Sequence, residues 1–231
     1  MIKLPFHAER PFTKQPMTPL EPNKTYHIFN HANGFESLFI SEENKRFFME
    51  RYATHIGPIA DTYAYCLMNN HFHLLLKIKG EEEVVNHMTS KVSNFGSHAG
   101  DGNKIEYFVS RQFANFFSSY TQAFNKMYGR MGSLFMKNFK REEITTEEHF
   151  RALVVYIHRN PVHHRFCNQF SDWNFSSYNS FVSSTNDNDN ISLDTEFVFQ
   201  AFGSMEAFGA VHAEKLEQFH FSTALDMFYK L

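Results

Sequence analysis

Two histidines stand two residues apart in the motif His71-Phe72-His73, at the start of a β-prone run. Side chains alternate between the faces of a strand, so both imidazoles point to one face while Phe72 points to the other. Two imidazoles on one face form half of a metal site, although a chain with 14 histidines contains some such pairs by chance. Three leucines follow the motif in place of a carboxylate, which argues against a zinc-activated water.

A second candidate group lies in Tyr156-Ile157-His158-Arg159-Asn160, within a segment whose pattern predicts a helix. Four residues at about 100° each return Asn160 to within roughly 40° of Tyr156, one turn along. The phenol and the amide therefore share a face and can serve one site. The alternative is a buried tyrosine followed by an Asn160-Pro161 helix stop.

A third feature is the stretch from Arg111 to Arg141, which holds six bases and no acid, with Phe and Tyr interspersed. Basic side chains neutralise phosphates and aromatic rings stack on exposed bases, so this composition suits a nucleic-acid backbone. A solvated helix face is the alternative explanation. The net charge of −3 argues against a basic coat for indiscriminate polyanion binding. Residues 182–231 carry much of the acidity, with eight acids and two bases.

The 231-residue chain is 42% apolar, enough for the buried core of one large domain, with or without an appendage, and its 28 phenylalanines predict an unusually aromatic core. No window reaches the roughly 18 apolar residues of a membrane span, and residues 1–22 lack a secretory signal. We therefore expect a cytoplasmic protein. Cys66 and Cys167 are expected to be reduced and structural, because two distant cysteines form neither a disulfide framework nor a four-cysteine zinc site.

Local patterns predict the elements that must position these residues. Strands are expected over residues 25–31, 62–67 and 72–78, the last two forming a hairpin. Helices are expected from Ser41 to about Gly57, from about Tyr107 to Met127, and from about Thr146 to Asn160, where Pro161 ends the helix. A loop is expected over 96–103, a linker over 183–190, and helical periodicity over 193–231.

Taken together, these motifs give the chain a family resemblance. Over roughly residues 26–178 it resembles the REP-associated tyrosine transposases, which are single-tyrosine transposases of the HUH class. The resemblance rests on five ordered segments, 26–34, 68–75, 129–135, 156–162 and 173–178. Relatives often have Met-Pro-Asn-His, and this chain has Asn69 where that proline would stand, which affects the turn rather than the histidines.

The resemblance implies a role for each candidate residue. Tyr156 would be the catalytic nucleophile, and His71, His73 and Asn160 would hold a divalent cation, Mg²⁺ or Mn²⁺ rather than Zn²⁺. A phenol with a pKa near 10 is about one part in a thousand ionised at neutral pH, so its attack on a phosphodiester needs help with both the nucleophile and the charge. Such a cation would supply that help. The nucleic-acid-binding candidates are Arg130, Lys137, Lys140, Arg141, His158 and Arg159. For the first four, solubility and core packing are the alternative explanation. For His158 and Arg159, which flank the proposed nucleophile, the alternative is an exposed helix end with polar residues.

The implied fold is α+β, a ferredoxin-like antiparallel sheet with helices packed on it, plus a C-terminal helical appendage. The expected organisation is an N-terminal arm over residues 1–22, an HUH tyrosine transposase catalytic domain over 23–181, and an acidic linker with an accessory helical segment over 182–231.

The implied function is metal-dependent cleavage and rejoining of single-stranded DNA at palindromic hairpin elements, through a 5′-phosphotyrosine intermediate. The partner would be single-stranded or hairpin DNA, and the sequence leaves open whether one chain or a homodimer completes the site. One alternative is a non-catalytic hairpin-binding protein derived from such an enzyme. The intact set of four residues favours catalysis. Another alternative, a phosphodiesterase that activates water, lacks extra carboxylates near the histidines.

Overall fold

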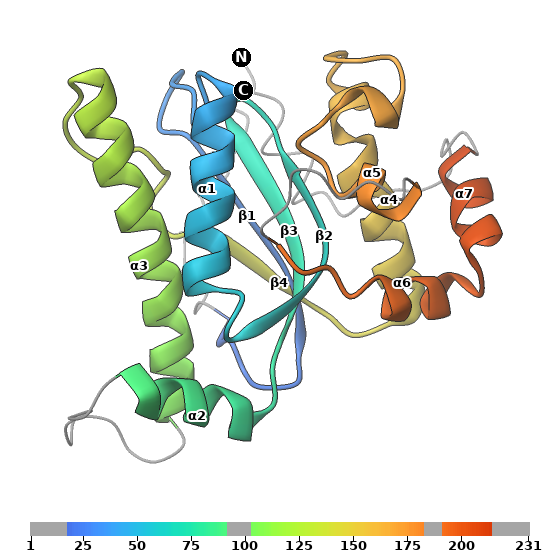
Figure 1. The fold of residues 1–231 in the computed structure, drawn as a ribbon, viewed down its shortest axis with the longest axis horizontal. Helices are drawn as coiled ribbons and strands as arrows, with labels where there is room; N and C mark the ends of the chain where they lie inside the picture. The colour runs from blue at the N-terminus through green and yellow to red at the C-terminus, as the bar shows by residue number, and fades with distance from the viewer. Residues whose placement is uncertain (1–17, 92–102, 183–190, 214–231) are drawn as a thin grey trace, which may run out of the picture.

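A four-stranded antiparallel sheet forms the centre of the protein (Figure 1). The computed structural model describes residues 18–91, 103–182 and 191–213. The strands are β1 (Thr25–His31), β2 (Ala60–Leu67), β3 (His71–Ile78) and β4 (Lys140–Ile144). Their order in the sheet is β2-β3-β1-β4, so β3 and β1 occupy the centre.

The connections give the sheet a ferredoxin-like topology. Both β1 and β2 pair antiparallel with β3, so they run parallel to each other with β3 between them. Helix α1 (Glu42–His55) joins β1 to β2, and helices α2 (Glu81–Lys91) and α3 (Asn103–Tyr128) join β3 to β4. This order of elements is the split βαβ arrangement. The predicted α+β fold is therefore confirmed.

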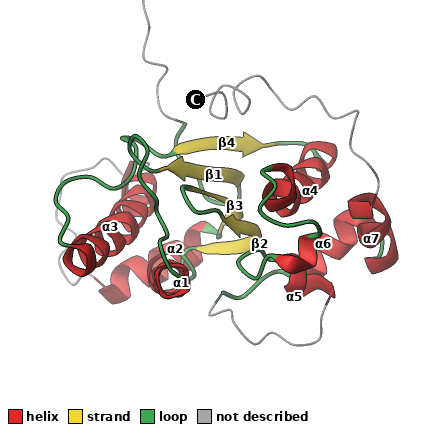
Figure 2. Cartoon of the chain, turned by 90° about the horizontal axis from the view of Figure 1, so that it is seen from above, coloured by secondary structure: helices red, strands yellow, loops and turns green. Residues whose placement is uncertain are grey.

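Helices cover both faces of the sheet (Figure 2). Helices α1 and α3 pack on one face, where the core is strongly aromatic, as the phenylalanine content predicts. The Phe48 ring, for example, lies 4.7 Å from that of Phe116 and 5.2 Å from that of Phe72. Rings in such edge and tilted contacts contribute about 0.5–1.5 kcal/mol per pair beyond the burial of their area. This layer makes the sheet a rigid support for whatever lies on its other face.

The opposite face carries a second core. The helices there are α4 (Glu147–His163), α5 (Tyr178–Val182), α6 (Thr195–Phe202) and α7 (Met205–Ala213), with a short 3₁₀ turn at Phe170–Asp172. The side chains of Leu153, Val154 and Ile157 in α4 are fully buried there, together with Leu75 of β3. Because of this packing, α4 is held against the central strands.

Several predicted boundaries are confirmed. Strand β1 has the expected bounds, and Ser41 caps α1 by accepting a hydrogen bond from the Asn44 N–H at 3.4 Å. Thr146 caps α4 by accepting from the His149 N–H at 3.2 Å. Residues 195–213 are largely helical, as their periodicity predicts.

The predicted end of α4 at Asn160 is wrong, because the helix continues through Pro161 to His163. Proline lacks the N–H that would bond to the Ile157 carbonyl, but only this one bond is lost and the helix ends two residues later. The carbonyl groups of Asn160 and Pro161 still accept hydrogen bonds from the His164 and Phe166 N–H groups, at 3.0 and 2.9 Å. The extra turn carries the end of the helix past Asn160.

Four elements were not expected from the sequence: strand β4, helix α2, the 3₁₀ turn and helix α5. Strand β4 reads Lys-Arg-Glu-Glu-Ile, a charged composition that is untypical of strands but common at sheet edges, where it prevents pairing with another chain. Helix α2 follows Gly80 and has three glutamates in its first turn. The predicted segments 1–17, 96–102, 183–190 and 214–231 lie outside the described residues, and the domain boundaries remain predictions. Among the described helices, none is long and apolar enough to cross a membrane.

Candidate active site

Strands β1 and β3 bring histidines together on the α4 side of the sheet. In the β1–β3 register, His31 pairs with His71 and Phe29 pairs with His73. Phe72 lies in the core on the opposite face, against α1 and α3. His71 and His73 therefore share one face and Phe72 takes the other, as strand alternation predicts.

Helix α4 places Asn160 against both histidines. Its Oδ1 lies 2.9 Å from Nε2 of His71, and its Nδ2 lies 3.3 Å from Nε2 of His73. All three side chains are buried, with exposed fractions of 5% or less. An amide and two imidazoles, separated by almost 90 residues in the sequence, thus form one compact group.

Tyr156 completes this group from one turn earlier in α4. Its ring lies edge-on to the His73 ring, with 5.4 Å between the centroids, and its side chain is half-buried. Its position follows from the packing of Leu153 and Ile157, which bury the adjoining faces of α4. The structure thus brings together all four residues that were predicted to form the reactive centre.

The contacts of His71 test whether these residues fit a cation. Its Nδ1 lies 2.8 Å from Oδ1 of Asn70, and its Nε2 faces Oδ1 of Asn160. Both partners are carbonyl oxygens, which only accept hydrogen bonds, and a neutral imidazole has a single N–H to donate. When Asn70 takes that N–H, the lone pairs of His71 Nε2 and Asn160 Oδ1 point at each other. A cation held by both atoms would resolve this conflict.

The distance between His71 Nε2 and Asn160 Oδ1 fits ligation of one cation by both atoms. Two ligands in adjacent positions of an octahedron, with bonds of about 2.0–2.1 Å, lie about 3 Å apart. The 2.9 Å between His71 Nε2 and Asn160 Oδ1 matches this separation. In the described part of the chain, no three His, Cys, Asp or Glu side chains form a metal-binding group. The candidate ligands are instead two imidazoles and an amide oxygen, a set that fits a divalent cation.

Burial keeps the histidines of the site neutral. Desolvation lowers the pKa of His71 to about 3 and holds the pKa of His73 well below its usual value. A neutral imidazole offers a lone pair, whereas a protonated one offers none, and metal ligation requires the lone pair. Both rings are therefore in the form that could hold a cation, and neither carries a charge.

Three further histidines surround the reactive group. Nε2 of His27 lies 3.0 Å from Nδ1 of His73, the His31 ring stacks on that of His71 with 5.9 Å between centroids, and His164 lies 5.3 Å from His71. Sequence reasoning did not assign roles to His27 and His31. Their spacing puts them on one face of β1, but only the β1–β3 register shows that this face adjoins His71 and His73.

Arg130 does not extend freely toward a ligand. Its guanidinium pairs with the Glu36 carboxylate and also donates to Oδ1 of Asn125 and to the carbonyl of Ser133, both at 2.8 Å. These bonds fasten the loop after β1 to the loop after α3. The described contacts make Arg130 a loop clamp, and its charge is largely compensated.

Lys137 and Lys140 lie beside the site. Both are exposed, and Lys140 pairs with Phe29 in the β1–β4 register, so it stands on the histidine face. The loop that carries Lys137 is held to the end of β1 by a 2.8 Å bond from the Met136 N–H to the His31 carbonyl. Arg141 pairs with Ile28 on the other face, where burial lowers its pKa and its guanidinium lies 4.7 Å from the Phe139 ring centre.

The prediction that His158 binds nucleic acid is wrong. Its side chain is fully buried behind α4, where Nδ1 lies 2.9 Å from His212 and Nε2 lies 2.8 Å from Ser177. A position 200° around the helix from Tyr156 faces away from the site. Arg159, which follows it, is half-buried with its guanidinium 5.9 Å from the centre of the Phe170 ring.

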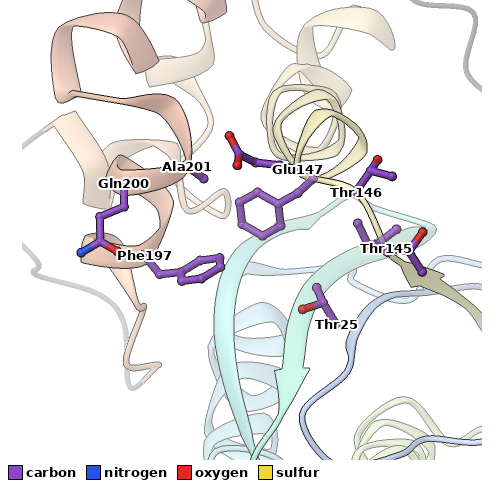
Figure 3. A pocket seen from close by; sticks show the side chains of 9 residues that line it. Thr25, Thr145, Thr146, Glu147, Phe197, Gln200 and Ala201 are labelled. Carbon is purple, nitrogen blue, oxygen red and sulfur yellow. The ribbon is translucent and has the colours of Figure 1, made fainter.

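Two cavities lie elsewhere. One, of about 380 Å³, opens between the start of α4 and helix α6 and is shown in Figure 3, where Phe197 of α6 and Glu147 of α4 point into the space between the two helices. The other, of about 530 Å³, lies beside the start of β2. None of the ten predicted site residues lines either cavity.

Comparison with known proteins agrees with this architecture. No protein-family model matches the chain, and no curated protein has a significantly similar sequence. Among solved structures, the chain is similar to the structure of a REP-associated tyrosine transposase bound to a REP hairpin, with a TM-score of 0.50 and 16% sequence identity. The match covers 79% of this chain and 93% of that chain. In fold, this chain is therefore similar to a REP-associated tyrosine transposase, as its motifs predict.

Proposed function

We propose that this protein cleaves and rejoins single-stranded DNA at hairpin elements, with Tyr156 as the nucleophile and His71, His73 and Asn160 as the protein ligands of Mg²⁺ or Mn²⁺. One observation carries the proposal. A phenol, an amide oxygen and two neutral imidazoles from β3 and α4 meet in one place on the sheet. Attack by tyrosine on a phosphodiester needs help with both the nucleophile and the developing charge, and a divalent cation held by these groups would supply it.

In the proposed reaction, Oη of Tyr156 attacks the scissile phosphorus and loses its proton to solvent. The P–O3′ bond breaks, the 3′-oxygen leaves and takes up a proton, and the 5′-phosphate stays bonded to Tyr156. One phosphoester replaces another, so the reverse attack by a 3′-hydroxyl rejoins the strand without nucleotide hydrolysis.

The other residues hold this arrangement in place. The bound cation would neutralise charge that develops on the phosphate oxygens. His71 and His73 offer their Nε2 lone pairs because burial keeps the rings neutral, and His27 orients His73 from behind through the 3.0 Å contact at Nδ1. Such outer contacts fix the ring orientation of a ligating histidine.

The DNA would approach the exposed rim beside β4. Lys140 supplies positive charge there on the same side as the histidines, and Lys137 is exposed in the loop that is bonded to the end of β1. The solved structure with a similar fold is that of a transposase bound to a REP hairpin, which supports hairpin DNA as the partner of this chain. We therefore propose that these lysines contact the phosphate backbone next to Tyr156.

Incubation with a labelled hairpin oligonucleotide that has single-stranded flanks, in Mg²⁺ or Mn²⁺, tests the proposal. We expect a protein-DNA adduct that survives a denaturing gel. Tyr156→Phe should abolish the adduct and leave hairpin binding within about twofold, because the ring remains and the hydroxyl alone is lost. Full cleavage by Tyr156→Phe would contradict the tyrosine assignment. Tight hairpin binding without any adduct, in either metal, would instead identify a non-catalytic hairpin-binding protein.

A further inference from the structure

A buried chain of polar side chains lies behind α4, on the side away from the proposed reactive centre. It consists of Ser177, which precedes α5, His158 in α4, and His212 in α7, all with exposed fractions of 2% or less. Ser177 Oγ lies 2.8 Å from His158 Nε2, and His158 Nδ1 lies 2.9 Å from His212 Nε2. The chain thus joins three elements that are far apart in the sequence.

The ends of this chain determine its direction. At one end the Tyr65 N–H of β2 donates to Ser177 Oγ at 2.9 Å, and at the other His212 Nδ1 lies 2.8 Å from the Phe208 carbonyl, which only accepts. His212 must therefore carry its proton on Nδ1 and accept from His158 Nδ1–H. His158 in turn accepts the Ser177 hydroxyl proton at Nε2, which lies 2.8 Å from Ser177 Oγ, closer than the Tyr65 carbonyl at 3.3 Å. Every group then donates once and accepts once, from the sheet to α7.

A fully satisfied chain of this kind resists rotation of the helix that it crosses. His158 lies between Tyr156 and Asn160 in α4 but points to the opposite side of the helix. Any rotation of α4 that moves His158 therefore also moves Tyr156 and Asn160. Aromatic rings close around His158, with centroids of Tyr178 and Phe181 at 5.7 and 5.6 Å. When a side-chain tip lies about 6 Å from the helix axis, a helix rotation of about 15° displaces it by about 1.5 Å.

We propose that His212 and Ser177, acting through His158, set the rotation of α4 and so hold Tyr156 and Asn160 in register with His71 and His73. They are positioning residues, and the inference rests on the function proposed above. In this proposal helix α7, which carries His212, helps to position the site and is not only an accessory helix. A misplacement of about 1 Å at a reactive centre can cost about a hundredfold in rate, so loss of this chain should reduce catalysis far more than DNA binding.

The test compares His212→Leu with His212→Gln. Leucine leaves the buried His158 N–H without an acceptor, whereas glutamine keeps one acceptor and one donor. We expect His212→Leu to lower the single-turnover rate of adduct formation at least tenfold with an unchanged hairpin Kd, and to weaken Mn²⁺ binding in a calorimetric titration without DNA. His212→Gln should restore both. Ser177→Ala provides a second break of the chain if His212→Leu fails to fold.

The control is Phe124→Leu, which loosens the aromatic core on the opposite face of the sheet, away from α4. At a temperature where all variants are folded, it should retain the wild-type adduct rate and Mn²⁺ affinity. Equal losses in Phe124→Leu and His212→Leu, or wild-type values in His212→Leu and Ser177→Ala, would overturn the positioning role.

Failure of the proposed function gives a different result. If the wild-type protein forms no adduct yet binds Mn²⁺, the cleavage proposal fails, while the Mn²⁺ affinities of the His212 variants still decide the positioning role. If the wild-type protein neither forms an adduct nor binds Mn²⁺, both proposals fall, because there is then no reactive arrangement for α4 to hold.

Discussion

Nε2 of His27 lies 3.0 Å from Nδ1 of His73, although the two residues come from different strands, 46 positions apart. The contact involves Nδ1 of His73. The other ring nitrogen of His73, Nε2, faces Asn160 and lies 3.3 Å from its Nδ2. His73 must donate through Nδ1 to keep its Nε2 lone pair free, so His27 has to be the acceptor in this pair. His27 is fully buried, and desolvation lowers its pKa to about 3, which keeps it in the neutral form that can accept.

This pair predicts an effect of His27 on metal affinity. In His27→Phe, Nδ1–H of His73 loses the acceptor that Nε2 of His27 provides, which should destabilise the fold by about 1–3 kcal/mol. The loss of an outer contact to a ligating histidine should also weaken Mn²⁺ binding about 10–100-fold. Titration calorimetry and thermal unfolding measure the two effects. His27→Gln is the matched variant, because its amide oxygen can accept the same proton. Unchanged Mn²⁺ affinity in His27→Phe would show that the contact does not support ligation.

Two basic residues of the segment 111–141 are predicted to have different roles, Lys137 in DNA binding and Arg130 in stability. Lys137→Ala should weaken DNA binding in a similar way for all sequences and reduce the slope of log K against log salt by about one, as expected for the loss of one phosphate contact. Arg130→Ala should leave that slope unchanged, because its charge is compensated by Glu36. It should instead lower stability by about 1–2 kcal/mol, since the clamp between the two loops is lost.

Binding isotherms at several salt concentrations and chemical denaturation measure these effects. Lys126→Ala, an exposed lysine near the end of α3, is the control for a general loss of charge. A reduced salt slope in Arg130→Ala, with Lys137→Ala like the wild-type protein, would reverse the assignment of the two residues.

The buried chain behind α4 predicts a dependence of stability on pH. Desolvation lowers the pKa of His212 to about 4, against 6.5 for an exposed histidine, despite an opposing contribution from its bond to the Phe208 carbonyl. Between these values the unfolded chain binds a proton at this position and the folded protein does not. The free energy of unfolding should therefore be at its full value above about pH 6.5 and decrease as the pH falls toward 4, by about 3 kcal/mol for this residue.

Comparison with His212→Gln isolates this contribution from those of the other buried histidines. Urea denaturation at a series of pH values should give a steeper decline for the wild-type protein than for the variant between about pH 6.5 and 4. Parallel curves would mean that His212 is not held neutral by the fold.

The sequence by itself determined the local features of this site. The alternation of His71, Phe72 and His73 and the one-turn spacing of Tyr156 and Asn160 are local periodicities, so they could be predicted before any tertiary arrangement was known. The caps at Ser41 and Thr146 are likewise local, since the capping bonds span three residues.

Only the tertiary structure decided how the pieces meet. The β1–β3 register sets His27 and His31 beside the motif of β3, and the packing of α4 turns Asn160 to the histidines and His158 away from them. The charged strand β4 and the clamp role of Arg130 also escaped prediction. Contacts of this kind join residues that are far apart in the chain, and their formation depends on which faces the whole core can bury, which local sequence does not encode.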